Sequence, residues 1–426
     1  MEDLFDRLAA RFAPDEPGVV FAMLHEGAVV HQGCFGQSEI AWKRPATADS
    51  VFAIASLSKP ITALLVLKLV EDAAIDLEGR VADYLPDYRG HGADVRVKHL
   101  LTHTSGIPNF FLLPGFQDGP VRPFHTNQQL CDVFAPLPLL FEPGSRYCYS
   151  NSGYRLLDMI VEAVTGQRFD DVLKERVFIP ANMTSSRVLN ETDIIPRRAT
   201  GYEFDGVEWR LASPVSPSLL GGAGGVATSL EDLISFDRAL WQDGLASQRV
   251  HEQMQTPVRL TSGREEGMGM GWVRTTYRSE LVLSFSGGLS GFSSLYCHLP
   301  ERSASVALLS NRGGLGVFDL ATEILDLAFD SPKSTASPSR QPKTSRDWSG
   351  FYTDSISRVA LRAVPDGYEL EDPWQTRLLV HTADLELTEV EALGVTVRLH
   401  DEPHAAITIN YPLTWFTGYL DAGVRD

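Results

Sequence analysis

Residues 51–60 read Val-Phe-Ala-Ile-Ala-Ser-Leu-Ser-Lys-Pro, and residues 61–70 continue the chain as Ile-Thr-Ala-Leu-Leu-Val-Leu-Lys-Leu-Val. The apolar residues of the second run surround a helix axis instead of forming one stripe, which predicts a buried, central helix. Pro60 suits the first turn of a helix, because the N–H that proline lacks has no partner there. Ser56 is therefore expected at the N-terminus of a buried helix, with Lys59 on the same face.

This position of Ser56 has a chemical consequence. The free N–H groups and the positive end of the helix dipole favour a nucleophile that becomes, or binds, an oxyanion. Serine is a weak nucleophile and needs an activating neighbour, and a lysine in a desolvated site can act as that base. On their own, the four residues from Ser56 to Lys59 are more typical of a serine N-cap followed by a surface lysine. The rest of the chain has to decide between the two.

Composition sets the broad class of the protein. The chain has 426 residues, enough for two or three domains, with 43% hydrophobic and 22% charged residues, as in soluble globular proteins. Its 37 basic and 55 acidic residues give a net charge of −18, which argues against a nucleic-acid or anionic-membrane partner. Acidic residues lie where a secretory signal needs positive charge, and no apolar run reaches membrane-spanning length. We expect a cytoplasmic protein.

Three further features bear on cofactors. The four cysteines, Cys34, Cys131, Cys148 and Cys297, are scattered and predict four buried free thiols. No histidine spacing suggests a metal site. The glycine-rich run 221–225 follows a Pro/Ser loop rather than a strand, and no Gly-Lys-Ser/Thr follows it, which argues against nucleotide binding. We expect neither a metal nor a cofactor.

Periodicity indicates the order of elements in the first part of the chain. It predicts a short helix at 3–12, a hairpin of strands 19–25 and 28–35 turning at Glu26-Gly27, and a helix through 156–164 capped by Gly166. Tyr149 would lie on the loop before that helix, where a phenol can point into a cleft. His99 and His103 are more typical of side chains that bond locally at a helix-to-loop junction.

The later part of the chain is rich in strands. A β-meander is predicted at 269–273, 281–285, 292–299 and 303–310, followed by a helix at 318–329. Residues 331–346 are rich in Ser, Pro and basic residues and predict a linker. Short alternating runs after it predict a small antiparallel β-barrel or sandwich, lipocalin-like, at 347–426. The expected organisation is a first domain at 1–330, this linker and an all-β domain.

Five motifs follow one another along the chain: Ser56-Leu57-Ser58-Lys59, Leu100-Leu101-Thr102-His103-Thr104-Ser105-Gly106, Tyr149-Ser150-Asn151, Ala223-Gly224-Gly225-Val226 and Gly287-Gly288-Leu289-Ser290-Gly291-Phe292-Ser293. In this order they resemble the motifs of the serine β-lactamase and D-alanyl-D-alanine peptidase superfamily. The similarity spans roughly residues 15 to 330 and is strongest to the class C β-lactamase-like esterases and D-aminopeptidases. Each motif is weak alone, but the ordered set favours Ser56 as a nucleophile.

The resemblance implies an α+β fold, in which both ends of the first domain form an antiparallel sheet flanked by helices, next to a helical region. It implies that Ser56 attacks a carbonyl, that Lys59 takes up the proton, and that Tyr149 relays a proton to the leaving group. Which of Lys59 and Tyr149 is the base stays open. Asn151 would orient the lysine or bind substrate. The backbone N–H groups of Ser56 and Gly288 would form the oxyanion hole.

Phe285 departs from the family pattern. Members that recognise a substrate carboxylate carry Lys or His two residues before the glycine that corresponds to Gly287, where this chain has Phe285. We therefore expect Phe285, together with Asn151 and Gly287, to contact a neutral acyl group, unless another cation such as Arg312 replaces the missing one. The resulting hypothesis is a serine hydrolase of neutral carboxylic esters or amides, with a small-molecule or short-peptide substrate.

Two kinds of alternative to this hypothesis stay open, and a third is excluded. A D-aminopeptidase, a D-amino-acid amidase or a peptide-cyclising acyltransferase is favoured by the appended β-domain, which such relatives also carry. A catalytically inert binding protein with the same fold is disfavoured by the intact Ser56, Lys59 and Tyr149. An α/β-hydrolase is excluded, because the chain contains no Gly-x-Ser-x-Gly elbow.

Overall fold

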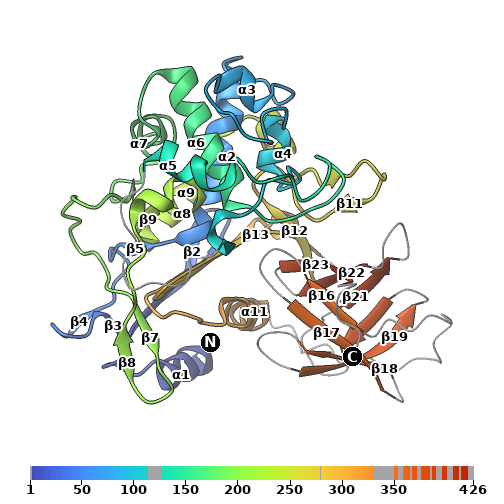
Figure 1. The fold of residues 1–426 in the computed structure, drawn as a ribbon. Helices are drawn as coiled ribbons and strands as arrows, with labels where there is room; N and C mark the ends of the chain where they lie inside the picture. The colour runs from blue at the N-terminus through green and yellow to red at the C-terminus, as the bar shows by residue number, and fades with distance from the viewer. Residues whose placement is uncertain are drawn as a thin grey trace.

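The computed structural model describes residues 2–113, 126–278 and 280–329, and eight strands between residues 350 and 420 (Figure 1). A six-stranded antiparallel sheet with the order β12-β13-β14-β15-β1-β2 organises the first part. Its strands are β1 (Val19–His25), β2 (Ala28–Phe35), β12 (Val273–Tyr277), β13 (Glu280–Leu289), β14 (Phe292–Leu299) and β15 (Ala304–Ser310). Strands from both ends of this part therefore share one sheet, as the family resemblance implies.

Strand β1 lies between β15 and β2 and is buried on both faces. Val20, Ala22 and Leu24 pack into the core shared with the helical region, while the alternate residues Val19 and Phe21 pack into a second core. Successive side chains of a strand point to opposite faces. This two-sided burial explains why β1 reads as a continuous apolar run rather than an alternating one.

Helices cover both faces of the sheet. Helices α1 (Glu2–Arg11) and α11 (Val317–Ala328) flank one face, where buried residues of α11 pack against those of β1, β14 and β15 (Figure 1). The helical region lies over the other face (Figure 1). It contains α2 (Ser58–Glu71), α3 (Val81–Tyr84), α4 (Val97–Leu101), α5 (Asn127–Phe134), α6 (Asn151–Thr165), α7 (Phe169–Leu173), α8 (Gly221–Gly224), α9 (Leu230–Trp241) and α10 (Gln248–Gln255).

Short strands tie the helical region together. A three-stranded sheet has the order β5-β9-β6, and three further pairs form two-stranded sheets. The bounds are β3 (Gln37–Glu39), β4 (Arg44–Pro45), β5 (Phe52–Ala53), β6 (Arg187–Val188), β7 (Tyr202–Phe204), β8 (Trp209–Leu211), β9 (Val226–Thr228), β10 (Val258–Arg259) and β11 (Glu265–Glu266). Strand β5 leads directly into the turn that carries Ser56, so its pairing with β9 anchors that turn.

Most of the helices and strands predicted for residues 2–329 are confirmed, but the prediction of the first strand of the β-meander is wrong. The predicted strand at 269–273 is irregular, and β12 begins only at Val273. Gly271 has φ +123, a conformation outside the extended region of L-residues, which breaks the strand. The apolar alternation arises instead because Trp272 is buried beside Trp241 and Tyr296.

The prediction of four buried thiols is wrong for two of them. None of the four cysteines forms a disulfide bond, but Cys34 is exposed and Cys148 is half-buried, whereas Cys131 and Cys297 are buried. Cys34 lies on β2, which is an edge strand of the sheet and is therefore less covered than its neighbours.

Strands β16 to β23 pair in sequence, each antiparallel to the next, and β16 pairs with β23. They are β16 (Gly350–Thr353), β17 (Arg358–Val364), β18 (Gly367–Glu371), β19 (Thr376–Ala383), β20 (Glu386–Glu389), β21 (Thr396–His400), β22 (Ala406–Tyr411) and β23 (Thr414–Leu420). The predicted linker, 331–346, lies outside the described residues. The boundary of a separate all-β domain at 347–426 stays a prediction.

Candidate active site

Ser56 lies in a single 3₁₀ turn, Ala55–Leu57, directly before α2. The predicted position at the start of a buried helix is thus shifted by one short turn, and Pro60 lies in the first turn of α2 as expected. Ala55 has φ +48, an uncommon conformation for a residue with a Cβ. Such backbone persists only where the surroundings hold it. The sharp turn sets the direction of the Ser56 side chain.

Two serine hydroxyls hold this turn in place. Ser58 Oγ donates to the Ala55 carbonyl at 2.7 Å and accepts from the Val226 N–H at 3.0 Å. Ser294 Oγ on β14 donates to the Ile54 carbonyl at 2.7 Å. The turn is therefore fixed both to β9 and to the large sheet.

Strand β13 packs its backbone directly on the same turn. A Cβ on Gly287 would lie 2.0 Å from the Ile54 carbonyl oxygen, so only glycine fits at this position. A Cβ on Gly288, in contrast, would meet none of the described atoms within 4 Å. The chain thus brings the β13 backbone beside the Ser56 turn while leaving space at Gly288. The assignment of an oxyanion hole to the N–H groups of Ser56 and Gly288 stays a prediction.

Four side chains predicted from the sequence are connected by hydrogen bonds. Tyr149 Oη donates to Ser56 Oγ at 2.7 Å, and Lys59 Nζ lies 3.3 Å from the same oxygen. Asn151 Oδ1 accepts from Lys59 Nζ at 2.8 Å. The structure therefore brings together Ser56, Lys59, Tyr149 and Asn151. They come from the turn before α2, from α2 itself, from the loop before α6 and from the first residue of α6.

Lys59 is completely buried, and its third polar contact was not foreseen from the sequence. Nζ donates to the Ala223 carbonyl oxygen at 2.5 Å. Burial lowers the pKa of Lys59 well below the ordinary value of a lysine, and Asp158 partly opposes this shift. A neutral amine has two N–H bonds and one lone pair. With Asn151 and Ala223 accepting the two N–H bonds, the lone pair is left for the Ser56 hydroxyl.

Tyr149 is the donor to Ser56 in this arrangement. Burial raises the pKa of Tyr149 above the ordinary value of a phenol, and the hydrogen bond to Ser56 only partly offsets this. The phenol therefore carries its proton at neutral pH. The hydrogen bonds therefore run from the Tyr149 hydroxyl to the Ser56 hydroxyl and from there to Lys59 Nζ. Along them a proton can pass from the serine to the lysine.

Asn109 is a second residue that sequence reasoning missed. Its Oδ1 accepts at 3.3 Å from both the backbone N–H and the Nδ2 of Asn151. These contacts orient the side chain of Asn151 so that its amide oxygen, Oδ1, faces Lys59 Nζ. Asn109 follows the Thr-Ser-Gly-Ile-Pro run of residues 104–108. Its position shortly after a family motif was the one available signal.

His103 packs against the site without reaching Ser56. Its Nδ1 accepts from the Ser150 N–H at 3.2 Å, and its ring lies 4.5 Å from the Tyr149 ring and 5.1 Å from the Tyr154 ring, measured between centroids. Burial lowers the pKa of His103 well below the ordinary value, so the ring is neutral. The interpretation of His103 as a locally bonded structural residue agrees with these contacts.

Phe285 lies on β13, one alternate position before Gly287. Its side chain is buried and packs in the core shared with the helical region, as does Leu283. Because alternate residues of a strand share a face, Phe285 and Gly287 both face the helical region. Arg312 is already engaged: it donates to Glu16 at 2.9 Å and to the Pro17 carbonyl at 2.7 Å. Arg312 is therefore a poor replacement for the cation that Phe285 lacks.

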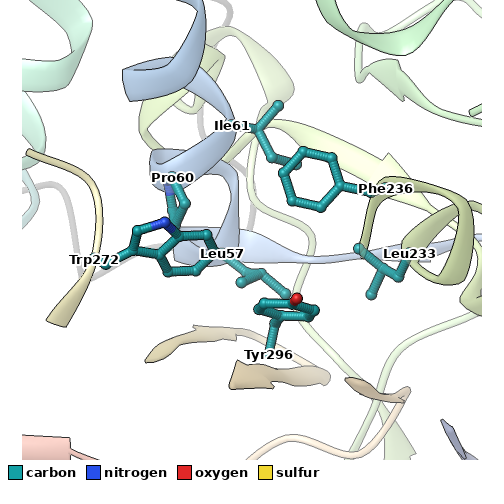
Figure 2. A pocket seen from close by; sticks show the side chains of 7 residues that line it. All are labelled: Leu57, Pro60, Ile61, Leu233, Phe236, Trp272 and Tyr296. Carbon is teal, nitrogen blue, oxygen red and sulfur yellow. The ribbon is translucent and has the colours of Figure 1, made fainter. Parts of the chain in front are cut away.

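Figure 2 shows a small apolar cavity behind the turn, between α2, α9, β14 and Trp272. Its volume is about 10 Å³, room for at most one water. Its lining residues are Leu57, Pro60, Ile61, Leu233, Phe236, Trp272 and Tyr296. The cavity is a gap in the packing beneath the Ser56 turn, too small to hold a substrate.

The described residues contain no group of three or more His, Cys, Asp or Glu side chains that could hold a metal ion. None of their helices has the length and apolarity needed to cross a bilayer.

Comparison with known proteins matches these elements to one family. The family model described as "Beta-lactamase" matches residues 2–329, which include the whole site. The chain belongs to the Beta-lactamase family. Within this family it is 33% identical over 303 residues to penicillin-binding protein 4* of Bacillus subtilis (strain 168), covering 67% of this chain and 66% of that protein.

Two further similar proteins have names that refer to D-aminopeptidase or D-amino acid amidase activity. A D-aminopeptidase of Gluconobacter oxydans (strain 621H) is 25% identical over 409 residues, which is 95% of this chain and 75% of that protein. The structure of a D-amino acid amidase from Ochrobactrum anthropi SV3, complexed with D-phenylalanine, is similar with a TM-score of 0.65 and 26% identity, covering 78% of this chain and 98% of that one. The chain thus spans 66% of the length of penicillin-binding protein 4* and 75% of the length of the D-aminopeptidase.

Proposed function

We propose that the protein is a serine hydrolase that forms an acyl-enzyme at Ser56. The observation that carries this proposal is the chain of contacts from Tyr149 Oη to Ser56 Oγ to Lys59 Nζ, with Lys59 fully buried. A buried amine with two carbonyl acceptors and one hydroxyl neighbour suits a general base. The same contacts argue against an inert binding protein with this fold.

The proposed reaction begins when Ser56 Oγ attacks the substrate carbonyl and its proton passes to Lys59. The N–H groups of Ser56 and Gly288 would stabilise the resulting oxyanion. The leaving alkoxide or amine then takes the proton of the Tyr149 hydroxyl, and the Tyr149 phenolate regains a proton from the Lys59 ammonium, which holds the one taken from Ser56. Water, or another acceptor such as the amine of a peptide, attacks the acyl-enzyme by the reverse sequence. This assignment makes Lys59 the base and Tyr149 the proton relay.

Replacing Tyr149 by Phe is expected to lower kcat by about 10²-fold, because the leaving group loses its proton donor. The matched control is Tyr154→Phe: the Tyr154 hydroxyl is also buried, but it donates to the Leu101 carbonyl at 3.0 Å. The control should cost about 1 kcal/mol of stability and leave kcat within about threefold of wild type. Equal losses of kcat in the two variants, at equal stability, would remove Tyr149 from the proposed mechanism.

We propose neutral carboxylic esters or amides as substrates. The support is Phe285, which places an aromatic ring where relatives that bind carboxylates have a cation, and the engaged Arg312. The D-aminopeptidase and D-amino acid amidase relatives support amides of D-amino acids within this class. The test is a comparison of kcat/KM among short-chain nitrophenyl esters, D-amino-acid amides, the same amides extended by a carboxylate-ended residue, and a chromogenic cephalosporin. Best turnover of the carboxylate-bearing substrates would reject this assignment.

Replacing Phe285 by His is expected to raise kcat/KM for carboxylate-ended substrates relative to their neutral counterparts. A desolvated charge pair is worth roughly 2–5 kcal/mol when one partner is removed, so a partial gain of about tenfold or more in this ratio is expected. Phe285→Leu is the matched control, since it removes the ring without adding a cation and should leave the ratio near the wild-type value. The ratio is measured with amide pairs that differ only in the terminal carboxylate, at a pH where the histidine is charged. An unchanged ratio in Phe285→His would exclude Phe285 from the acyl or leaving-group site.

A further inference from the structure

A buried ion pair lies under the glycine-rich run of residues 221–225. Arg155 and Asp158, both on α6, form it through Arg155 Nη1 and Asp158 Oδ2, and both residues are buried. Asp158 Oδ2 also accepts from the Gly222 N–H at 2.9 Å. Arg155 Nη2 donates to Asn127 Oδ1 at 2.6 Å. None of these residues belongs to the reaction sequence proposed above.

The glycines pack flush against this pair. A Cβ on Gly221, which has φ +42, would lie 1.2 Å from Arg155 Nη1, and a Cβ on Gly222 would lie 2.2 Å from Asp158 Oδ1. Any larger residue would displace the ion pair or the backbone. The glycines are therefore explained by contact with Arg155 and Asp158, and the run is not a phosphate cradle.

The same backbone reaches Lys59. The Gly222 carbonyl accepts from Thr62 Oγ1 at 2.9 Å, and the next carbonyl, that of Ala223, accepts from Lys59 Nζ at 2.5 Å. Asp158 thus holds one end of a two-residue segment whose other end contacts Lys59. A shift of Gly222 would move the carbonyl that accepts one of the two N–H bonds of a neutral Lys59.

The ion pair is poorly suited to a purely stabilising role. Asp158 Oδ1 and Arg155 Nε are buried and have no hydrogen-bond partner among the described residues. A buried pair repays its desolvation only when its remaining polar atoms are also bonded, and apolar residues of similar volume often serve stability as well. The pair is connected to Lys59 through the backbone of Gly222 and Ala223, which suggests a role in the active site rather than in stability.

We infer that Arg155 and Asp158 are positioning residues for Lys59. Through Gly222 they hold the Ala223 carbonyl against Nζ, and the carboxylate of Asp158 supplies the negative charge that acts on the buried amine. This inference rests on the proposed role of Lys59 as base. Removing the carboxylate should both misplace the amine and make it easier to deprotonate.

The charges around Lys59 support a lower pKa of Lys59 when the Asp158 carboxylate is removed. Among the residues that the structure describes, Asp158 is the charged group that favours the protonated form of Lys59. Burial raises the pKa of Asp158, while Arg155 and the Gly222 N–H oppose this rise and favour the charged carboxylate. The other titratable groups facing Lys59 or Asp158 are Arg155, Glu162, His103, Tyr149 and Tyr154. Burial keeps His103 and the two tyrosines neutral, and Glu162 is bonded to Asn127 and to the Phe169 N–H.

The test is the pH profile of kcat/KM for a neutral nitrophenyl ester. Activity should rise with pH as Lys59 loses its proton. This rise is the acid limb of the profile. In Asp158→Asn the acid limb should move to lower pH by about 0.5–1 unit, and the plateau of kcat/KM should fall by about 10–100-fold. Asp158→Glu, which keeps the charge, should retain the wild-type limb while losing part of the plateau.

Two further variants separate positioning from stability. Asp237→Asn removes another buried carboxylate, one that accepts from Tyr296 Oη in the sheet core, and it should leave the limb unmoved. The double variant Arg155→Met/Asp158→Leu replaces the pair by apolar side chains and serves if Asp158→Asn fails to fold. It should show the same shift of the limb as Asp158→Asn. A wild-type limb and a plateau within about twofold of wild type in the folded variants would overturn the inference.

Labelling of wild-type Ser56 by a fluorophosphonate separates this outcome from a failure of the proposed function. An adduct on Ser56 together with a wild-type limb and a plateau within about twofold of wild type in the variants rejects only the role of Arg155 and Asp158. No adduct on Ser56 rejects the proposed function, and this inference with it.

Discussion

Ser56→Ala is expected to lower kcat for a nitrophenyl ester by at least about 10⁴-fold, because alanine has no hydroxyl to attack the substrate carbonyl. The Ser56 side chain is the point where the hydrogen bonds of Tyr149 and Lys59 converge. Alanine removes this point and leaves the surrounding turn, which Ser58 and Ser294 hold, intact. The variant should therefore fold with near wild-type stability.

The matched control for this variant is Ser247→Ala. Ser247 is exposed and caps α10, where its Oγ accepts from the Val250 N–H at 3.2 Å. Losing the cap should cost about 1 kcal/mol of stability without changing kcat. Residual turnover in Ser56→Ala above about 1% of wild type, after contaminating hydrolases are excluded, would place the nucleophile elsewhere.

Lys59→Met is expected to lower kcat/KM by about 10³–10⁴-fold, since the base is lost while the volume of the buried side chain is kept. The matched control is Lys68→Met on the same helix: Lys68 Nζ also donates to a carbonyl, that of Leu245, at 2.7 Å. The control should retain kcat/KM within about threefold, because Lys68 makes no contact with Ser56.

The pH dependence gives Lys59 a second signature. Burial lowers its pKa in the folded protein below the value in an unfolded chain. The folded state therefore gains stability relative to the unfolded state as pH rises through the interval between these two values. Activity should rise over the lower part of the same interval. A Lys59→Met variant with wild-type kcat/KM, or a wild-type rate that falls as pH rises there, would assign the base to another group.

Patterns that act locally were sufficient to predict several helices and strands of residues 2–329, while the sheet shared by both ends of this part followed from the family resemblance. The Glu26-Gly27 turn and its flanking apolar runs identify β1 and β2, and Gly166 marks the end of α6 because it adopts the left-handed conformation. Residues Ser56 and Lys59 are also local, one helical turn apart. Adding Tyr149 and Asn151 needed the ordered family motifs, since 93 residues separate Tyr149 from Ser56.

Contacts across the chain account for what the sequence did not predict. Ala223 acts through a backbone carbonyl, which leaves no trace in the identity of its side chain. Asp158 is an acidic residue within an apolar helix stretch, and only the packing of α8 on α6 reveals that it faces Gly222. The start of β12 was misplaced because burial of Trp272 imitates the alternation of a strand.

The most direct test of covalent catalysis at Ser56 is intact-mass spectrometry after treatment with a fluorophosphonate. The wild-type protein should gain one adduct, and digestion should place it on the peptide that contains Ser56. Ser56→Ala should gain none, and Lys59→Met should react far more slowly than wild type, because the amine no longer removes the proton. An adduct of full yield in Ser56→Ala, or one that maps to another peptide of the wild-type protein, would contradict the proposed mechanism.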